Sequence, residues 1–131
     1  MEGGRWKEPH TGGSRQSQGE NLQVWQKEMA LVTEVSQLTK SFPKDESYGL
    51  TSQLRRAAVS VPVTIAEGKG RYHRKEYVQF LDMARGSIYE AMTLVRVAQE
   101  LGYVPTTHGA TLLTRCSEIT AMLNGLIRSL Q

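Results

Sequence analysis

The sequence lacks the features that most directly mark a secreted or membrane protein. Cys116 is its one cysteine, so no disulfide can form within the chain, and such sparing use of cysteine is typical of reducing compartments. No stretch reaches the roughly 20 apolar residues that cross a bilayer. No continuous apolar segment near the N-terminus resembles a secretory signal. We therefore expect a cytoplasmic protein that does not associate with membranes.

The chain also lacks the residue patterns of metal sites and of common catalytic groups. Its histidines, His10, His73 and His108, have no second ligand at metal-site spacing. No glutamate has a histidine three residues later, as carboxylate-bridged di-metal bundles require. Residues 68–70 resemble a fragment of a phosphate loop, but they follow a helical pattern rather than a strand. No serine, histidine and acid form a recognisable triad. We expect no metal, no cofactor and no catalytic residue.

What the chain does contain is helical periodicity over most of its length. Residues 1–20 are the exception, because they hold five glycines and no period, and we predict a disordered tail there. Residues 21–131 are long enough for one domain with its own core. No strand pattern competes, so we predict an all-α fold, an antiparallel up-and-down four-helix bundle. The expected helices span residues 21–41, 49–68, 74–101 and 110–130.

The first, third and fourth helices each have one apolar stripe, which we assign to the bundle core. Cys116 belongs to the stripe of the fourth helix, so we interpret it as a small core residue rather than a reactive thiol. The stripe of the first helix consists of Leu22, Trp25, Met29 and Val32, widened by Leu31, Val35, Leu38 and Phe42. That of the third consists of Tyr77, Phe80, Ala84, Ile88, Ala91, Val95 and Ala98. That of the fourth is a heptad seam of Leu112, Cys116, Ile119, Leu123, Leu126 and Leu130.

The second helix differs because it has apolar residues on two opposite faces. At 100° per residue, Val59, Val63 and Ala66 lie nearly opposite the core stripe. A bundle buries only one face of a surface helix, so the second face predicts a neighbouring copy of the protein. The core stripe consists of Leu50, Leu54, Ala57, Ala58, Val61 and Ile65.

Proline and glycine interrupt this pattern at defined places. Pro62 lies inside the second helix, where proline costs about 3 kcal/mol. The apolar arc keeps its phase beyond it, so we predict one helix kinked at Pro62 rather than two separate helices. We expect Gly68 and Gly70 to end this helix in the left-handed conformation, and Gly102 to end the third helix. Gly86 lies opposite the core stripe of the third helix, where we expect it to let another chain come close.

Glu67 has two interpretations. A carboxylate on a buried line can act as a general acid or base. It can also form an ion pair, with Arg56 or with an arginine on a neighbouring helix, and so hold the register between subunits. We favour the structural role. The predicted oligomer interface consists of Arg56, Val59, Ser60, Val63, Ala66, Glu67 and Gly86.

Basic residues are concentrated in one part of the chain. The whole chain has a net charge of +3, whereas residues 50–75 hold six basic residues against Glu67 alone, a net charge of +5. Such a concentration can neutralise phosphates, and Tyr72 within it can stack on a base. The alternative is a set of solvated charges at a helix junction. The predicted nucleic-acid-binding residues are Arg55, Lys69, Arg71, Tyr72, Arg74 and Lys75.

A long ordered set of residues resembles a known family. The chain is similar, over about residues 22–130, to small bacterial proteins from open reading frames inside 23S rRNA intervening sequences. The central matching run is Phe42-Pro43, Glu46, Tyr48-Gly49-Leu50, Gln53-Leu54-Arg55-Arg56-Ala57-Ala58-Val59-Ser60 and Ile65-Ala66-Glu67-Gly68. It is preceded by Trp25 and followed by Glu76, Phe80-Leu81, Ala84, Gly86-Ser87, Glu90 and Leu101-Gly102-Tyr103.

The resemblance implies a four-helix bundle that assembles into a ring, typically a homopentamer. The superfamily includes the accessory protein of diversity-generating retroelements, which resembles a basic barrel and binds a reverse transcriptase and nucleic acid. The present sequence departs from the family pattern at two informative places. Val63 and Thr64 stand where the family often has Ser-Asn. His73 stands where the family tends to place a serine that caps the third helix, so we expect a weaker cap.

Three hypotheses about function follow. We favour a non-enzymatic binding module in which a ring of bundles presents the basic residues to RNA or DNA, with a possible protein partner. The first alternative is a purely structural or protein-binding oligomer. The second is an unrecognised enzyme, which would need a pocket with converging polar groups near Glu67 and Arg56.

Overall fold

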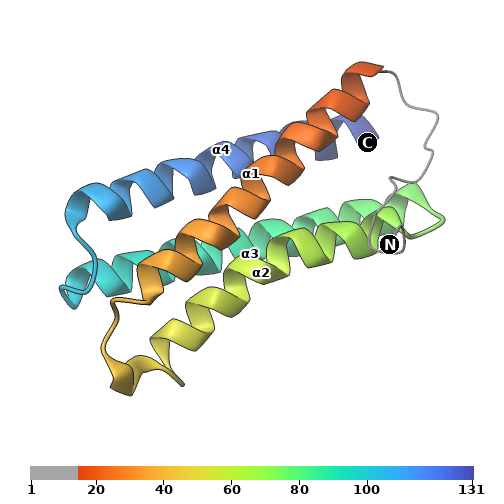
Figure 1. Ribbon diagram of the computed structural model, residues 1–131. Coiled ribbons are helices and arrows are strands. Elements are labelled where there is room, and N and C mark those ends of the chain that lie inside the picture. The colour runs from red at the N-terminus through yellow and green to blue at the C-terminus, as the bar shows by residue number, and fades with distance from the viewer. Residues whose placement is uncertain (1–14) are drawn as a thin grey trace, which may run out of the picture.

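The computed structural model describes residues 15–131, with side chains from Leu22 onward. Its regular elements over this range are all helical. Four long helices run alternately up and down (Figure 1), which confirms the predicted antiparallel four-helix bundle. The helices are α1 (Arg15–Thr39), α2 (Leu50–Lys69), α3 (Arg74–Glu100) and α4 (Thr106–Leu130), and a short 3-10 turn, η2 (Lys44–Glu46), joins α1 to α2.

The boundaries of α2 and α3 agree with the prediction within one or two residues, but those of α1 and α4 do not. Helix α1 begins six residues before the predicted start at Asn21, so residues 15–20 of the expected tail are helical. The rest of that expected tail, residues 1–14, lies outside the described part of the chain. Helix α4 begins at Thr106 rather than Ala110, directly after Pro105, whose backbone is extended.

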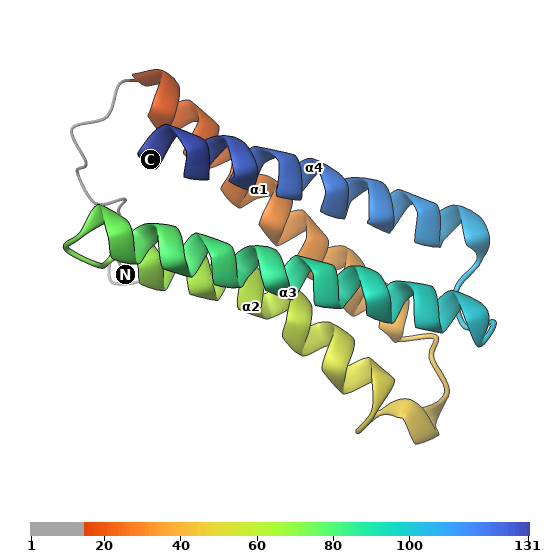
Figure 2. The ribbon, with the colours of Figure 1, turned by 180° about the vertical axis from the view of Figure 1, so that it is seen from behind.

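Each helix packs against two others, in the pairs α1–α2, α2–α3, α3–α4 and α1–α4. The view from behind shows α2 and α3 side by side for much of their length (Figure 2). Polar contacts join α4 to α1 and to α3. Arg115 of α4 forms an ion pair with Glu34 of α1, and Arg85 of α3 donates a 2.6 Å hydrogen bond to Asn124 of α4.

The core confirms most of the predicted stripes. All six predicted core residues of α2 are buried, as are the five predicted residues of α3 from Ala84 to Ala98. In α4, Cys116 is fully buried, and burial raises the pKa of its thiol to about 11, so it is a core residue as predicted. At the end of α4 the buried residue is Ile127, whereas Leu126 and Leu130 are half-buried.

The predicted core stripe of α1 is right in part. Leu31, Val35 and Phe42 are buried, whereas the seam that begins at Leu22 is rotated away from the core. Leu22 and Met29 are 53% and 40% exposed, although the prediction placed both in the core. The buried positions are instead Val24, Glu28, Leu31 and Val35. At 100° per residue, Leu22 and Met29 point about 130° to 150° away from the middle of this stripe. The first half of α1 therefore contributes a carboxylate to the interior.

Helix α2 is continuous through Pro62, which is buried. This confirms one helix rather than two, and the kink stays a prediction. The predicted left-handed stop at Gly68 and Gly70 is wrong, because Gly68 is helical and Gly70 has φ −76°. Gly68 serves close packing instead, since a Cβ there would lie 2.6 Å from the Cβ of Phe80 on α3. Gly102, with φ +78°, does end α3 in the left-handed conformation.

Candidate nucleic-acid interface and assembly face

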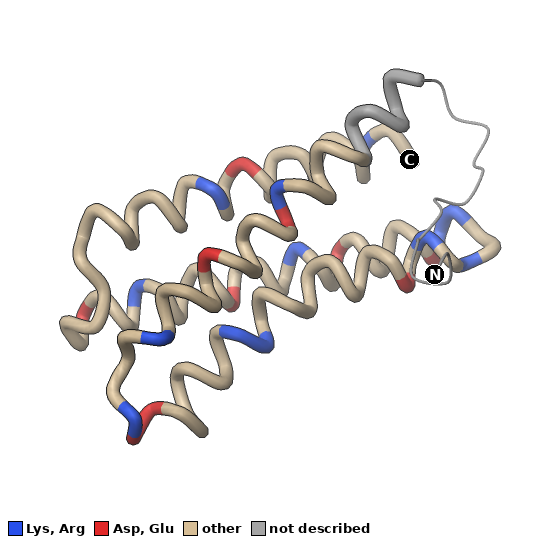
Figure 3. The backbone as a smooth tube through the Cα atoms, in the orientation of Figure 1, with Lys and Arg blue, Asp and Glu red and all other residues tan. Residues whose placement is uncertain are grey.

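The turn between α2 and α3, residues 69–75, is the candidate nucleic-acid interface and is called the basic turn below. Lysine and arginine gather there at one end of the bundle (Figure 3). The turn closes tightly, because the backbone N–H of Arg71 donates to the carbonyl of Gly68. His73 is extended and gives α3 no side-chain cap, as the sequence predicted. The positive end of the α3 dipole therefore adds to the side-chain charges of the turn.

Tyr72 projects from the tip of the basic turn and is 92% exposed. Its nearest aromatic neighbour is the His73 ring, with centroids 5.0 Å apart and planes inclined by 74°. This edge contact covers one face of the phenol ring at most. The ring is therefore accessible to a ligand.

The four basic residues of the turn have different surroundings. The Arg71 guanidinium lies 4.8 Å from the centre of the Phe80 ring, a cation–π contact that orients it. Lys69 is half-buried, and its charge acts on Glu28 of α1. Arg74 and Lys75 are exposed in the first turn of α3. The structure thus brings together five of the six predicted residues: Lys69, Arg71, Tyr72, Arg74 and Lys75.

Arg55, the sixth predicted residue, lies elsewhere. It is fourteen residues before Lys69, so it sits about 21 Å away along α2. Its Nε donates a 2.7 Å hydrogen bond to the hydroxyl of Thr39, and a second N–H reaches the carbonyl of Ser36 at 3.4 Å. Arg55 therefore joins α2 to the end of α1 and is not part of the basic turn.

The side of α2 that faces away from the core carries the second apolar strip. Val59 and Val63 are 45% and 50% exposed within one subunit, and Ala66 is half-buried. These three residues are called the α2 outer face below.

Among the other predicted interface residues, Arg56, Ser60 and Glu67 lie beside this face on α2, and Gly86 lies on α3. Arg56 and Glu67 are exposed, and no ion pair joins them in the described part of the chain. The Ser60 hydroxyl donates to the carbonyl of Ala57 at 2.8 Å. On α3, a Cβ at Gly86 would meet no atom within 4 Å. Each of these residues is thus open to a second copy, which stays a prediction.

Two surface hollows among the described residues lie away from Arg56 and Glu67. The larger, of about 490 Å³, lies between α1 and α4 and is lined by Leu38, His108 and Leu112 among others. No group of three metal-ligating side chains occurs in residues that the structure describes. No helix within the described residues is long and apolar enough to span a membrane. The pocket that the enzyme hypothesis needs near Glu67 is therefore not among these hollows.

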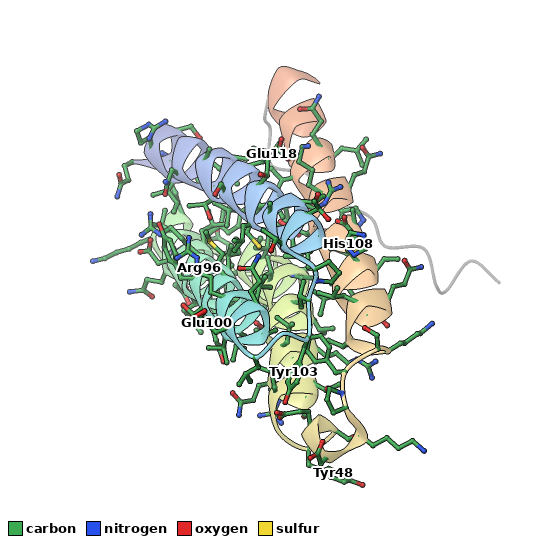
Figure 4. All side chains as sticks on the ribbon, turned by 90° about the vertical axis from the view of Figure 1, so that its left-hand side faces the viewer. Tyr48, Arg96, Glu100, Tyr103, His108 and Glu118 are labelled. Carbon is green, nitrogen blue, oxygen red and sulfur yellow. The ribbon has the colours of Figure 1, made fainter. Side chains whose placement is uncertain are left out.

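The opposite end of the bundle is closed by aromatic and carboxylate contacts. The Tyr103 hydroxyl donates a 3.0 Å hydrogen bond to Glu46, and the Tyr103 ring packs on Phe42 with centroids 5.6 Å apart. That hydrogen bond is the main cause that raises the pKa of Tyr103. Tyr48 extends into solvent near η2 (Figure 4). This end carries an exposed tyrosine without a basic cluster around it.

Glu28 is the unusual residue that sequence reasoning missed. It is fully buried, and neither carboxylate oxygen has a hydrogen-bond partner among the described residues. Burial raises the pKa of its carboxyl from 4.5 to about 8, and the positive charge of Lys69 limits the rise. One signal was present in the sequence: Glu28 occupies the middle of the series Val24, Glu28, Leu31, Val35, which has core spacing.

The model of the family described as 23S rRNA-intervening sequence protein matches residues 20–125, most of the chain. The chain belongs to the 23S rRNA-intervening sequence protein family. The resemblance stated from the sequence is thereby confirmed. No curated protein matches the sequence.

A solved structure agrees with this assignment at the level of the fold. It is the crystal structure of a protein of unknown function from the S23 ribosomal protein family of Bacteroides thetaiotaomicron. The two folds superpose with a TM-score of 0.76 at 17% sequence identity, over 83% of the present chain and 97% of the other. At that identity the likeness concerns the arrangement of the helices, so function has to be argued from surfaces.

Proposed function

We propose that this member of the 23S rRNA-intervening sequence protein family is a non-enzymatic, cytoplasmic nucleic-acid-binding protein. It assembles as a homo-oligomer, for which we favour a ring of five subunits, and each subunit presents its basic turn to RNA or DNA. The observation that carries the proposal is the basic turn itself. It joins four basic side chains, an exposed aromatic ring and the positive end of α3 on one protrusion.

Electrostatics favours nucleic-acid binding over the alternative, in which the charges of the turn are merely solvated. Cations that lie close together on a surface sum to a local positive potential, which is screened over about 8 Å at physiological salt. The basic turn holds four cations within seven consecutive residues, and none of the seven is acidic. Repetition of the turn around a symmetric ring multiplies the positive field.

The α2 outer face supports self-assembly. Val59 and Val63 expose about half of their surface in the single subunit, and such a strip between polar borders is typical of an interaction site. Gly86 adds a place where a second backbone can approach without displacing a side chain. The family resemblance points to the same mode of association.

We expect removal of charge from the basic turn to weaken nucleic-acid binding. In the double variant Arg74→Gln/Lys75→Gln, two exposed cations are lost, and each lost phosphate contact lowers the slope of log affinity against log salt by about 0.7 to 0.9. Fluorescence anisotropy of labelled RNA at several salt concentrations measures this slope. The matched control is Lys40→Gln/Arg96→Gln, which removes two exposed cations outside the turn. Equal loss in both variants would show a general charge effect and contradict the assignment.

We expect a charge on the α2 outer face to dissociate the oligomer. Val63→Glu places a carboxylate where an apolar contact is proposed, so the mass measured by light scattering should fall to that of one subunit. Gly86→Leu tests the predicted contact on α3 separately. Leu101→Glu is the control, because Leu101 is an exposed apolar residue at the far end of α3. A wild-type protein that is monomeric in dilute solution would remove the assembly from the proposal.

The alternative, a structural or protein-binding oligomer, makes the opposite prediction for charge. Neutralising the basic turn would then leave partner binding and assembly unchanged. The two experiments together distinguish the alternatives, because the first acts on the turn and the second on the α2 outer face.

A further inference from the structure

We infer that the basic turn selects single-stranded nucleic acid, by stacking Tyr72 on an unpaired base while Arg74 and Lys75 contact the adjoining phosphates. This inference rests on the proposed function, since it concerns which form of nucleic acid the same turn binds. It is carried by the placement of one aromatic ring among the cations.

The Tyr72 ring has the geometry of a stacking platform. It is 92% exposed at the tip of the basic turn, and the edge contact with His73 leaves at least one of its two faces open. The His73 ring lies beside it in a T-shaped contact, with centroids 5.0 Å apart. Stacking on an aromatic side chain accepts any base, because every base has a π-face.

The cations suit a short single-stranded segment. Arg71 is held on Phe80, and Lys69 is half-buried beside α1. The exposed pair Arg74 and Lys75 directly follows Tyr72 and His73 in the chain. A base on Tyr72 and the phosphates on either side of it therefore fall within reach of the first turn of α3, whose N–H groups lack a side-chain cap.

A duplex fits the same turn less well. In double-stranded nucleic acid the base faces are covered by neighbouring base pairs, so Tyr72 would find only backbone and groove edges. Reading a major groove takes a whole helix or a two-stranded ribbon, and the basic turn offers neither. With duplex, Tyr72 would contribute nothing and the affinity would rest on charge alone.

The test uses the full chain and four labelled probes of one sequence: single-stranded RNA, single-stranded DNA, and the duplex of each. Anisotropy at a fixed salt concentration should give affinities about tenfold or more higher for the single strands than for the duplexes. Tyr72→Ala should weaken single-strand binding by about fivefold or more and leave duplex binding unchanged. Tyr72→Phe and Tyr72→Trp should keep the preference. Tyr48→Ala is the matched control, because Tyr48 is fully exposed at the opposite end.

The outcomes separate this inference from the proposed function. Duplex binding as tight as single-strand binding, or single-strand binding indifferent to Tyr72→Ala, would overturn the inference and leave the proposed function in place. Binding to none of the four probes would overturn the proposed function. The RNA and DNA arms tell which sugar the turn prefers, and a single-strand preference in either arm supports the inference.

Discussion

Glu28→Gln is expected to stabilise the protein by several kcal/mol, on the order of 3 to 5, at pH 9 and by about 1 kcal/mol or less at pH 5. Glutamine keeps the shape of the side chain and cannot ionise. The reference carboxyl is fully buried, has no hydrogen-bond partner for either oxygen among the described residues, and has its pKa raised from 4.5 to about 8. Ionisation of Glu28 in the folded protein therefore lowers the free energy of unfolding.

The direction of the pH dependence follows from proton binding. Below about pH 4.5, Glu28 is protonated in both the folded and the unfolded chain, so its titration does not affect stability. Between pH 4.5 and 8 the unfolded chain loses this proton while the folded chain keeps it, and stability falls as pH rises. Above pH 8 both forms are ionised and the loss levels off. The wild-type protein should thus be less stable at alkaline pH, and Glu28→Gln should remove this slope.

Chemical denaturation at a series of pH values measures the effect. Glu100→Gln is the control, since Glu100 is an exposed glutamate of α3 (Figure 4) and its loss should leave the pH curve unchanged. Lys69→Met should move the midpoint to higher pH, because the positive charge of Lys69 lowers the pKa of Glu28. A stabilisation by Glu28→Gln that is the same at pH 5 and pH 9 would contradict the assigned burial.

Gly68→Ala is expected to destabilise the protein by about 2 kcal/mol. A Cβ at this position would lie 2.6 Å from Phe80 Cβ and 3.0 Å from Tyr77 Cδ1. Phe80 Cβ is attached directly to the backbone of α3, so the clash requires α2 and α3 to separate. Alanine is the better helix former by about 1 kcal/mol, but this gain does not offset the overpacking.

Gly86→Ala is the matched control, because Gly86 is also helical and a Cβ there meets nothing within 4 Å. It should stabilise the single subunit by up to about 1 kcal/mol through helix propensity. Urea denaturation of both variants, under conditions that keep the subunits apart, gives the comparison. Similar effects of the two substitutions would contradict the close contact of α2 with α3. Since Gly68 adjoins the basic turn, Gly68→Ala should also weaken nucleic-acid binding.

The sequence by itself determined the order of the helices, the boundaries of α2 and α3, the core stripes of these two helices, and the family. The reason is that a period of 3.6 residues records which side of a helix is buried, and Gly102 and Pro105 record where α3 stops. It also identified the basic turn, since residues 69–75 are adjacent in the chain and a tight turn keeps them together.

Tertiary structure alone decided how these faces meet. The stripe of α1 was ambiguous because its apolar residues cover more than one arc, and packing against α2 and α4 selected Val24, Glu28 and Leu31 and left Met29 in solvent. Arg55 has the same charge as the cations of the basic turn but lies near the other end of α2, where it is hydrogen-bonded to Thr39 of α1. The role of Gly68 likewise depends on Phe80, twelve residues later. Periodicity fixes the direction in which a residue points around its own helix axis. Which residues of another helix it contacts depends on how the two helices pack against each other.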